Sequence, residues 1–107
     1  MSEFAGTLKE RIIIERPADL RTASGLQTAA WEPVARCLAA IVAEGVGPEA
    51  EAQTLSAMPR YRVTIRRRDG IEVGQRVMWG QRAMLVKQRI DDPKLPDRIL
   101  LKCEEVR

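Results

Sequence analysis

Hydrophobic and polar residues alternate between positions 60 and 90 in a manner typical of β-strands. Tyr61, Val63 and Ile65 fall on one face of an extended chain, while the residues between them are arginine or threonine. β-Branched and aromatic residues at a period of two indicate a strand with one buried face and one exposed face. This stretch is therefore expected to form the centre of the fold.

Two turn signals divide the stretch. Asp69-Gly70 suits a tight turn because glycine adopts positive φ without a steric cost. Gly80-Gln81 places a glycine at the first of two central positions, which fits a type II′ hairpin. We therefore predict a meander of three antiparallel strands over residues 60–68, 71–79 and 82–90.

Strands are also predicted at the two ends of the chain. Residues 9–16 contain three consecutive isoleucines, which suits a strand covered on both faces. Pro17 should end this strand because proline gives no N–H group to a ladder, and residues 18–28 should form a loop. A last strand is expected over Arg98–Val106, after a turn-rich loop over 91–97.

Residues 31–43 are compatible with either a helix or a strand. Val34 and Leu38 recur at helical spacing, Pro33 fits a first helical turn, and the alanine content favours a helix. The alternation over 34–42 also fits a buried strand, although local propensity alone would choose the helix. The local pattern leaves both structures open.

Residues 44–58 hold two glycines, Pro48 and few large apolar side chains. Pro48 suits the start of one or two helical turns, but little in the segment anchors it to a core. It is therefore expected to be the most mobile internal segment.

Length and composition predict one ordered domain over residues 1–107. With 45% hydrophobic and 31% charged residues the chain is not of the disordered class. Because only 4% of the residues are aromatic, the core must consist mainly of aliphatic side chains. The net charge of +3 is compatible both with simple solubility and with nucleic acid nearby.

Several classes of chemistry lack their usual residues. The chain has no histidine and no closely spaced cysteines, so neither a zinc site nor histidine base catalysis is expected. Cys37 and Cys103 are predicted to be buried thiols, and Glu104 and Glu105 should point to opposite faces of a strand rather than form an acid–base pair. We predict no enzymatic activity, no cofactor and no metal. With no signal core and no apolar run of ~18 residues, synthesis in a reducing cytoplasm without membrane insertion is expected.

A set of arginines around the predicted meander is the one candidate binding feature. Its members are Arg60, Arg62, Arg66, Arg67, Arg68, Arg76 and Arg82. Guanidinium groups grip phosphate or carboxylate in a bidentate manner, so the set is a candidate contact for nucleic acid or for an acidic subunit. The alternative is a solvated outer face that keeps sheet edges from pairing wrongly.

An ordered set of short segments resembles the small head–tail joining proteins, also called head-closure or stopper proteins, of long-tailed phages and gene-transfer particles. The segments are Ala5–Ile12, Gly25 with Trp31, Tyr61–Arg66, Arg76–Arg82 and Leu100–Glu105. Their common order along the chain carries the resemblance.

The resemblance implies a mostly β fold: a small antiparallel β-barrel of about six strands, with a long internal loop and room for one short helix. It also implies that residues 34–43 form a strand. Proteins of this kind form a ring in the virion neck, between the portal or adaptor above and the tail terminator or another tail protein below. The implied partners are therefore other copies of the chain, those neck proteins, and double-stranded DNA retained without sequence readout, all in a bacterial host.

The same resemblance places a channel-facing loop at residues 44–58. Its candidate residues are Glu44, Gly45, Gly47, Pro48, Glu49, Glu51 and Gln53. The candidate contacts for phosphate or for a neighbouring subunit are Arg60, Arg62, Arg66, Arg67 and Arg68. Two other functions stay open, a small-barrel nucleic-acid-binding module and another tail-connector component. The residues do not specify whether the particle is a phage, a prophage remnant or a gene transfer agent.

Overall fold

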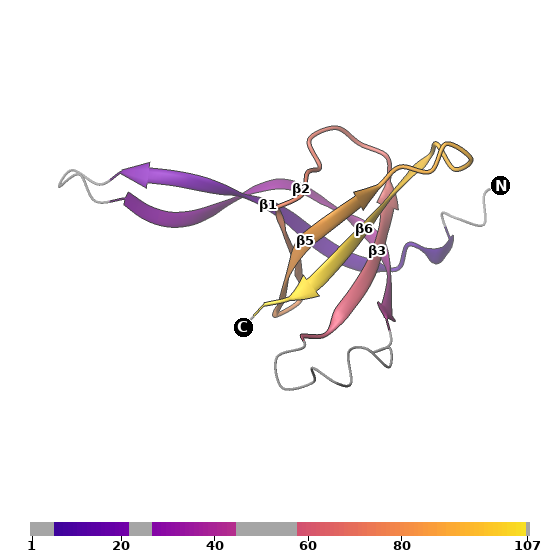
Figure 1. Ribbon diagram of the computed structural model, residues 1–107, viewed down its shortest axis with the longest axis horizontal. Helices are drawn as coiled ribbons and strands as arrows, with labels where there is room; N and C mark the ends of the chain where they lie inside the picture. Colours follow the sequence, from indigo (N-terminus) through magenta and orange to yellow (C-terminus); the bar gives the residue numbers. More distant parts are fainter. Residues whose placement is uncertain (1–5, 22–26, 45–57, 107) are drawn as a thin grey trace.

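A computed structural model describes residues 6–21, 27–44 and 58–106 of the chain. Its strands are β1 (Glu10–Arg21), β2 (Gln27–Glu44), β3 (Arg60–Arg66), β4 (Arg76–Trp79), β5 (Arg82–Ile90) and β6 (Arg98–Glu105). All paired strands are antiparallel, and they close into a barrel in the order β1-β2-β3-β6-β5-β4 (Figure 1). The predicted fold class, a small antiparallel β-barrel, is confirmed.

Aliphatic side chains fill the barrel. Its fully buried members come from all sides of the wall and include Ile14 on β1, Ile65 on β3, Val77 on β4, Met84 on β5 and Leu101 on β6. Closure pairs the strand edges around the wall with one another, so it is the two ends of the barrel that need covering by loops.

β3 and β6 confirm the alternation predicted for them. On β3, Tyr61, Val63 and Ile65 are buried, whereas Arg60, Arg62 and Arg66 on the other face are exposed. On β6 every second residue is buried in the same way, starting at Ile99. The two strands pair along nearly their whole lengths, with Val63 opposite Leu101.

The first half of the predicted meander is wrong. β3 pairs with β2 and β6, whereas β4 pairs with β1 and β5, so β3 and β4 are not neighbours. Residues 67–75 instead cross the end of the barrel as a loop (Figure 1). Ile71 is 0% exposed and fills this end of the barrel. Gly74 has a φ of 95°, which lets the backbone turn just before β4 begins. The apparent strand over 71–79 is therefore one inserted isoleucine followed by the short β4.

The second predicted turn is confirmed. Trp79 and Arg82 are paired across Gly80-Gln81. Gly80 has a φ of 59°, and no non-glycine residue in the described ranges has a positive φ. Positive φ at the first central position alone is the type II′ pattern.

β1 and β2 are longer than the barrel wall and leave it together as a projecting arm (Figure 1). β4 pairs with β1 only over Ile13–Glu15, and β3 pairs with β2 only over Ala40–Glu44. In the described structure, residues 16–21 and 27–32 pair only with each other. We call these two segments the arm.

The arm overturns the predicted boundary at Pro17. β1 continues through this proline to Arg21, and the described residues of the predicted loop, 18–21 and 27–28, are strand. The last residue of β1 that pairs with β4 is Glu15. Pro17 lies beyond it and has β2 as its one strand neighbour, so its missing N–H removes no hydrogen bond to β4. Residues 22–26 lie outside the described residues.

β2 resolves the choice between helix and strand over residues 31–43. The segment is strand, as the resemblance implied, because pairing with β1 along most of its length overrides the helix preference of alanine. Ala35 and Ala39 are buried, so small side chains fit where the two strands line the core. Of the predicted loop over 44–58, Glu44 belongs to β2, and residues 45–57, with the short helix expected there, lie outside the described residues.

Candidate functional site

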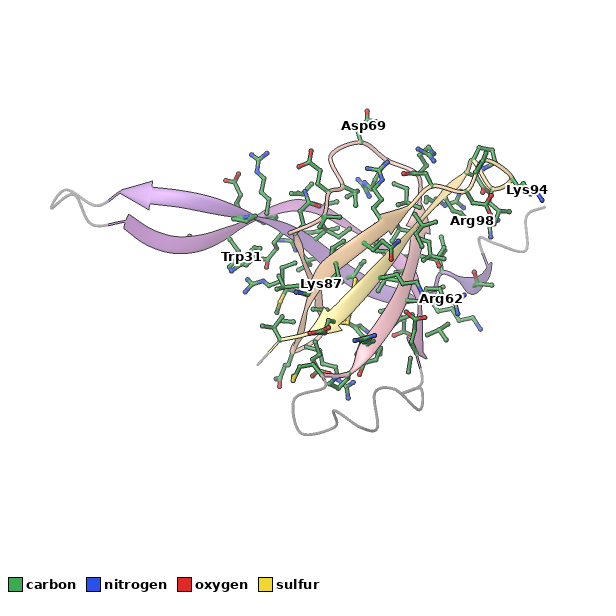
Figure 2. All side chains as sticks on the ribbon, in the orientation of Figure 1. Trp31, Arg62, Asp69, Lys87, Lys94 and Arg98 are labelled. Atoms are coloured by element: carbon green, nitrogen blue, oxygen red, sulfur yellow. The ribbon has the colours of Figure 1, made fainter. Side chains whose placement is uncertain are left out.

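The outer faces of β3 and β6, with the end of β2, form a charged wall. Its members are Glu44, Arg60, Arg62, Arg66, Lys102 and Glu104. Arg62 lies opposite Lys102 across the strands, and Figure 2 shows it on the outside of the barrel. Three of the five sequence-predicted arginines are thus brought together on one surface.

Acidic side chains neutralise part of this wall. Arg60 Nε lies 3.8 Å from Glu104 Oε2, and Lys102 Nζ lies 3.2 Å from Glu44 Oε2. Such exposed pairs contribute about 0–1 kcal/mol each, so their cations remain accessible to other anions. Within the described ranges neither Arg62 nor Arg66 forms an ion pair, and both are exposed, so both guanidinium groups are accessible to a phosphate.

An open hollow of about 500 Å³ adjoins the wall and extends it onto β5. Lys87 and Gln88 line the hollow together with wall residues from β2, β3 and β6. Its chemistry suits an extended anion such as a phosphate backbone or an acidic protein surface. In the part of the chain that the structure describes, no group of three or more Cys, Asp or Glu residues is placed to hold a metal ion.

Arg67 and Arg68 do not belong to the wall. Arg67 Nη2 donates to Asp91 Oδ1 at 2.8 Å and Arg67 Nε donates to the Pro96 carbonyl at 2.8 Å, so it ties two loops at one end of the barrel. The hydrogen bond from Arg89, followed by the charges of Arg89 and Arg67, holds the pKa of Asp91 below its usual value. Arg68 lies instead beside the Cys37 thiol.

The two remaining arginines of the set are also used within the fold. Arg76 donates from Nε and Nη2 to Glu15 Oε1, at 2.9 and 2.6 Å, and its guanidinium lies 4.5 Å from the centre of the Trp31 ring. Arg82 Nη1 donates to Tyr61 Oη at 2.8 Å. Arg76 therefore fixes the root of the arm rather than forming part of the wall.

Of the predicted channel-loop residues, Glu44 alone lies in the described structure. It ends β2, and Arg60, which begins β3, is its cross-strand partner. Both ends of the segment therefore meet the charged wall. Gly45, Gly47, Pro48, Glu49, Glu51 and Gln53 lie outside the described residues.

The two cysteines are free thiols with suppressed reactivity. Burial raises the pKa of Cys103 to about 12. Burial also raises the pKa of the half-buried Cys37, although the charge of Arg68 opposes the shift. Since the thiolate is the reactive form, neither thiol is primed as a nucleophile at neutral pH.

A family model of phage head completion proteins matches residues 5–106. The chain belongs to this family. The membership confirms the resemblance seen in the short sequence segments. It also makes this head completion protein a structural component of a phage or phage-like particle. The described residues include no helix with the length and apolarity needed to cross a membrane.

Two solved structures share the barrel of this head completion protein. A protein of Shigella flexneri 2a, determined in solution, superposes with a TM-score of 0.68 at 22% identity, covering 94% of each chain. A chain in the virion of a native gene transfer agent particle gives a TM-score of 0.65 at 14% identity, covering 92% of this chain and 96% of that chain. At these identities the likeness shows the fold. Among curated proteins, none matches the sequence.

Sequence reasoning missed the residues that hold this head completion protein's surface elements in place. The Gln75 side chain is 5% exposed and bridges the loop over 67–75, and Glu15 forms an ion pair with Arg76 at the root of the arm. A single glutamine between Gly74 and Arg76 carries no signal of burial. The pairing of Glu15 with Arg76 could have been found only from the β1–β4 register.

Proposed function

We propose that this head completion protein is a ring subunit in the neck of a phage or phage-like particle, between the portal or adaptor and the tail. The match of the head completion family over residues 5–106 is the observation that carries the proposal. The fold shared with a chain of a native gene transfer agent virion supports it.

The division of the molecule into a closed barrel and a projecting arm suits such a subunit. A closed barrel has a buried core of its own, while the arm extends beyond it with strands that pair only with each other in the described structure. Isolated two-stranded ribbons are marginal in water, so the arm is expected to gain stability from a neighbouring protein. A ring multiplies weak contacts between subunits, so each contact need not be strong.

Retention of packaged DNA is assigned to the charged wall and to the segment over 44–58. Arg60, Arg62 and Arg66 are placed to hold phosphates without reading sequence, because backbone contacts carry no base information. The segment starts and ends beside the same wall, at Glu44 and Arg60. Arg67 and Arg68 serve the fold and are left out of this role.

Electron microscopy of intact particles tests the location of the chain. The proposal requires density for a ring of barrels between head and tail. Density in the capsid shell or at the tail tip contradicts it. If the ring lies closer to the tail, among the tail connectors, the chain is another connector component and does not contact the portal or adaptor.

A deletion tests the retaining segment. Removing Ala50–Ala57 should leave the barrel folded and produce filled particles that leak DNA. A matched variant replaces the same eight residues with glycine and serine, which keeps the length of the segment. Comparing the two variants shows whether DNA retention depends on the amino-acid sequence of the segment or only on its length. If the deletion unfolds the protein, the segment is structural and its assignment to the channel is wrong.

Arg62 also supports the second candidate, a small nucleic-acid-binding barrel, because it is exposed and without an ion pair in the described ranges. This function predicts that the isolated monomer binds DNA with an affinity that falls steeply as salt rises. Arg62→Glu should abolish such binding, whereas Lys94→Glu, a change of equal charge on the loop over 91–97, should weaken it little. No binding at low salt rules this function out.

A further inference from the structure

A second hollow, of about 550 Å³, opens on the outer face of β1, β2 and β4. The register brings its apolar floor together: Ile13 of β1 lies opposite Met78 of β4, and Leu38 of β2 lies alongside. Arg11 lies opposite Leu38 and Arg36 lies opposite Ile13, so two guanidinium groups flank the floor. We call these five residues the basic-rimmed hollow.

The hollow has the composition of an unoccupied interface. Leu38 is 46% exposed, and Val42, further along the same face of β2, is 53% exposed. Neither Arg11 nor Arg36 forms an ion pair within the described ranges. Apolar surface grouped in this way and bordered by charge marks a site for another protein.

The chain itself presents a surface with the opposite charge. On the loop over 67–75, Val73 is 58% exposed, the largest value among the exposed large hydrophobic residues described. Asp69 and Glu72 precede it on the same loop, are exposed, and form no ion pair in the part of the chain described. Figure 2 shows Asp69 projecting from the end of the barrel. We call these three residues the acidic tip.

The acidic tip is held in a fixed shape before any contact. Ile71 anchors the loop in the core, and the Gln75 side chain bonds to both Gly70 and Glu72. A preformed loop loses little conformational entropy on binding, so most of the contact energy is retained.

We propose that the basic-rimmed hollow receives the acidic tip of a second copy of the chain. Val73 then covers the apolar floor, and Asp69 and Glu72 meet Arg11 and Arg36. Charge complementarity between these two surfaces of one chain selects a second copy as the occupant. The inference rests on the proposed function, since it names the contact between neighbouring subunits of the ring.

The placement of the two surfaces sets the symmetry of this contact. The hollow lies on the side wall at β1, β2 and β4, whereas the tip lies on the loop that crosses the barrel end. A contact between two different surfaces is heterologous, and it repeats around an axis into a ring when the rotation closes. Its charged rim also makes the association weaker at high salt.

A charge swap tests the contact in the purified full-length chain, with self-association measured by sedimentation over a range of protein and salt concentrations. Arg36→Glu and Glu72→Arg should each lower the association constant at least ~10-fold, because each brings like charges together. The double variant should recover association to within ~3-fold of the wild type. Val73→Ser should also weaken association.

The loop over 91–97, at the same end of the barrel, supplies matched controls. Lys94→Glu and Leu95→Ser change one charge and one exposed apolar residue, and they should leave association unchanged. Any one of three results overturns the proposal. The controls lower the association constant as much as the charge reversals do, the single reversals leave it unchanged, or the double variant does not recover it. If the purified chain is monomeric at every concentration, the same variants are tested in particle assembly. The single reversals should then reduce assembly and the double variant should recover it, and failure to recover overturns the proposal.

This experiment separates the contact from the neck function. If microscopy places the chain in a neck ring and the swap does not recover assembly, the contact is wrong and the proposed function stands. If the purified chain associates through a swap-sensitive contact and is not found in the neck, the contact stands and the proposed function fails.

Discussion

Replacing Gln75, the one uncharged polar side chain on the loop over 67–75, with alanine should destabilise the barrel. Gln75 Nε2 donates to the Gly70 carbonyl at 2.7 Å, and Gln75 Oε1 accepts from the Glu72 N–H at 3.0 Å. The residue is 5% exposed, so water has little access to replace either bond. The side chain therefore fixes the loop over residues 70–75, next to the point where the backbone of Gly74 and Gln75 is hydrogen-bonded to Val86 of β5.

The expected magnitude follows from these two bonds. A net hydrogen bond contributes about 0.5–1.5 kcal/mol, and a buried group left without a partner costs about 1–3 kcal/mol. We expect Gln75→Ala to lower the free energy of unfolding by about 2–3 kcal/mol, which is a large share of the total of about 5–15 kcal/mol for a small domain. The midpoint of thermal unfolding should fall by about 10 °C or more.

Gln75→Glu is the matched variant. It keeps the side-chain length and the acceptor for Glu72, but an ionised carboxylate has no proton to donate to Gly70. Burial at this site should raise the pKa of the new carboxyl in the folded protein above the ordinary value of about 4.3. Its deficit relative to the wild type should therefore be full at pH 7, shrink as the pH falls through that raised pKa, and change no further below about pH 4.

Urea unfolding followed by circular dichroism measures both variants, and hydrogen exchange of the Glu72 amide reports on the loop itself. The slope of the urea dependence should be unchanged, because the surface exposed on unfolding is nearly the same. If Gln75→Ala has the same urea midpoint as the wild type and its Glu72 amide is equally protected from exchange, the Gln75 side chain does not stabilise the loop as inferred.

Three further changes have defined outcomes. Arg76→Ala should destabilise the root of the arm by about 2–3 kcal/mol, since it leaves a partly buried carboxylate unpaired, and should shift the fluorescence of Trp31. Cys103 has a folded pKa of about 12 against 9.0 for the free thiol, so its contribution to stability is complete below pH 9 and is lost as the pH rises toward 12. It should resist a thiol reagent at pH 8 until urea unfolds the chain, and labelling at the unfolded rate contradicts this. Gly80→Ala should cost about 1 kcal/mol in urea unfolding because its φ is 59°, and Gly80→Asn should cost less.

The alternation of hydrophobic and polar residues correctly predicted the strands that have one face toward the core and one face toward solvent. β3 and β6 fit this rule along their lengths, and Gly80 marked the one hairpin whose geometry is local. These features depend on neighbours a few residues away, so a single sequence contains them.

Strand partners were not predictable in the same way. The partners of β3 are β2, the strand before it, and β6, the last strand, rather than β4, which follows it. Nothing in residues 67–75 distinguishes a hairpin from a loop that crosses the barrel end. Pro17 misled for a related reason, because the cost of a missing N–H depends on whether a third strand is present.

The arginine set shows why adjacency in sequence is a poor guide to a binding surface. Arg66 ends β3 on the charged wall, Arg67 ties two loops together, and Arg68 lies beside Cys37. Three consecutive guanidinium groups thus have three different environments once the strand ends. The wall became visible only when the β3–β6 register was known.

The arm gives the molecule an adjustable reach. Residues 16–21 and 27–32 pair only with each other in the described structure, so residues added in matched pairs, one per strand, extend the arm by about 3.3 Å per pair and leave the barrel register intact. An unmatched insertion instead turns every following side chain to the opposite face. Related particles with different spacings between neighbouring components could therefore vary the length of the arm and retain the same barrel.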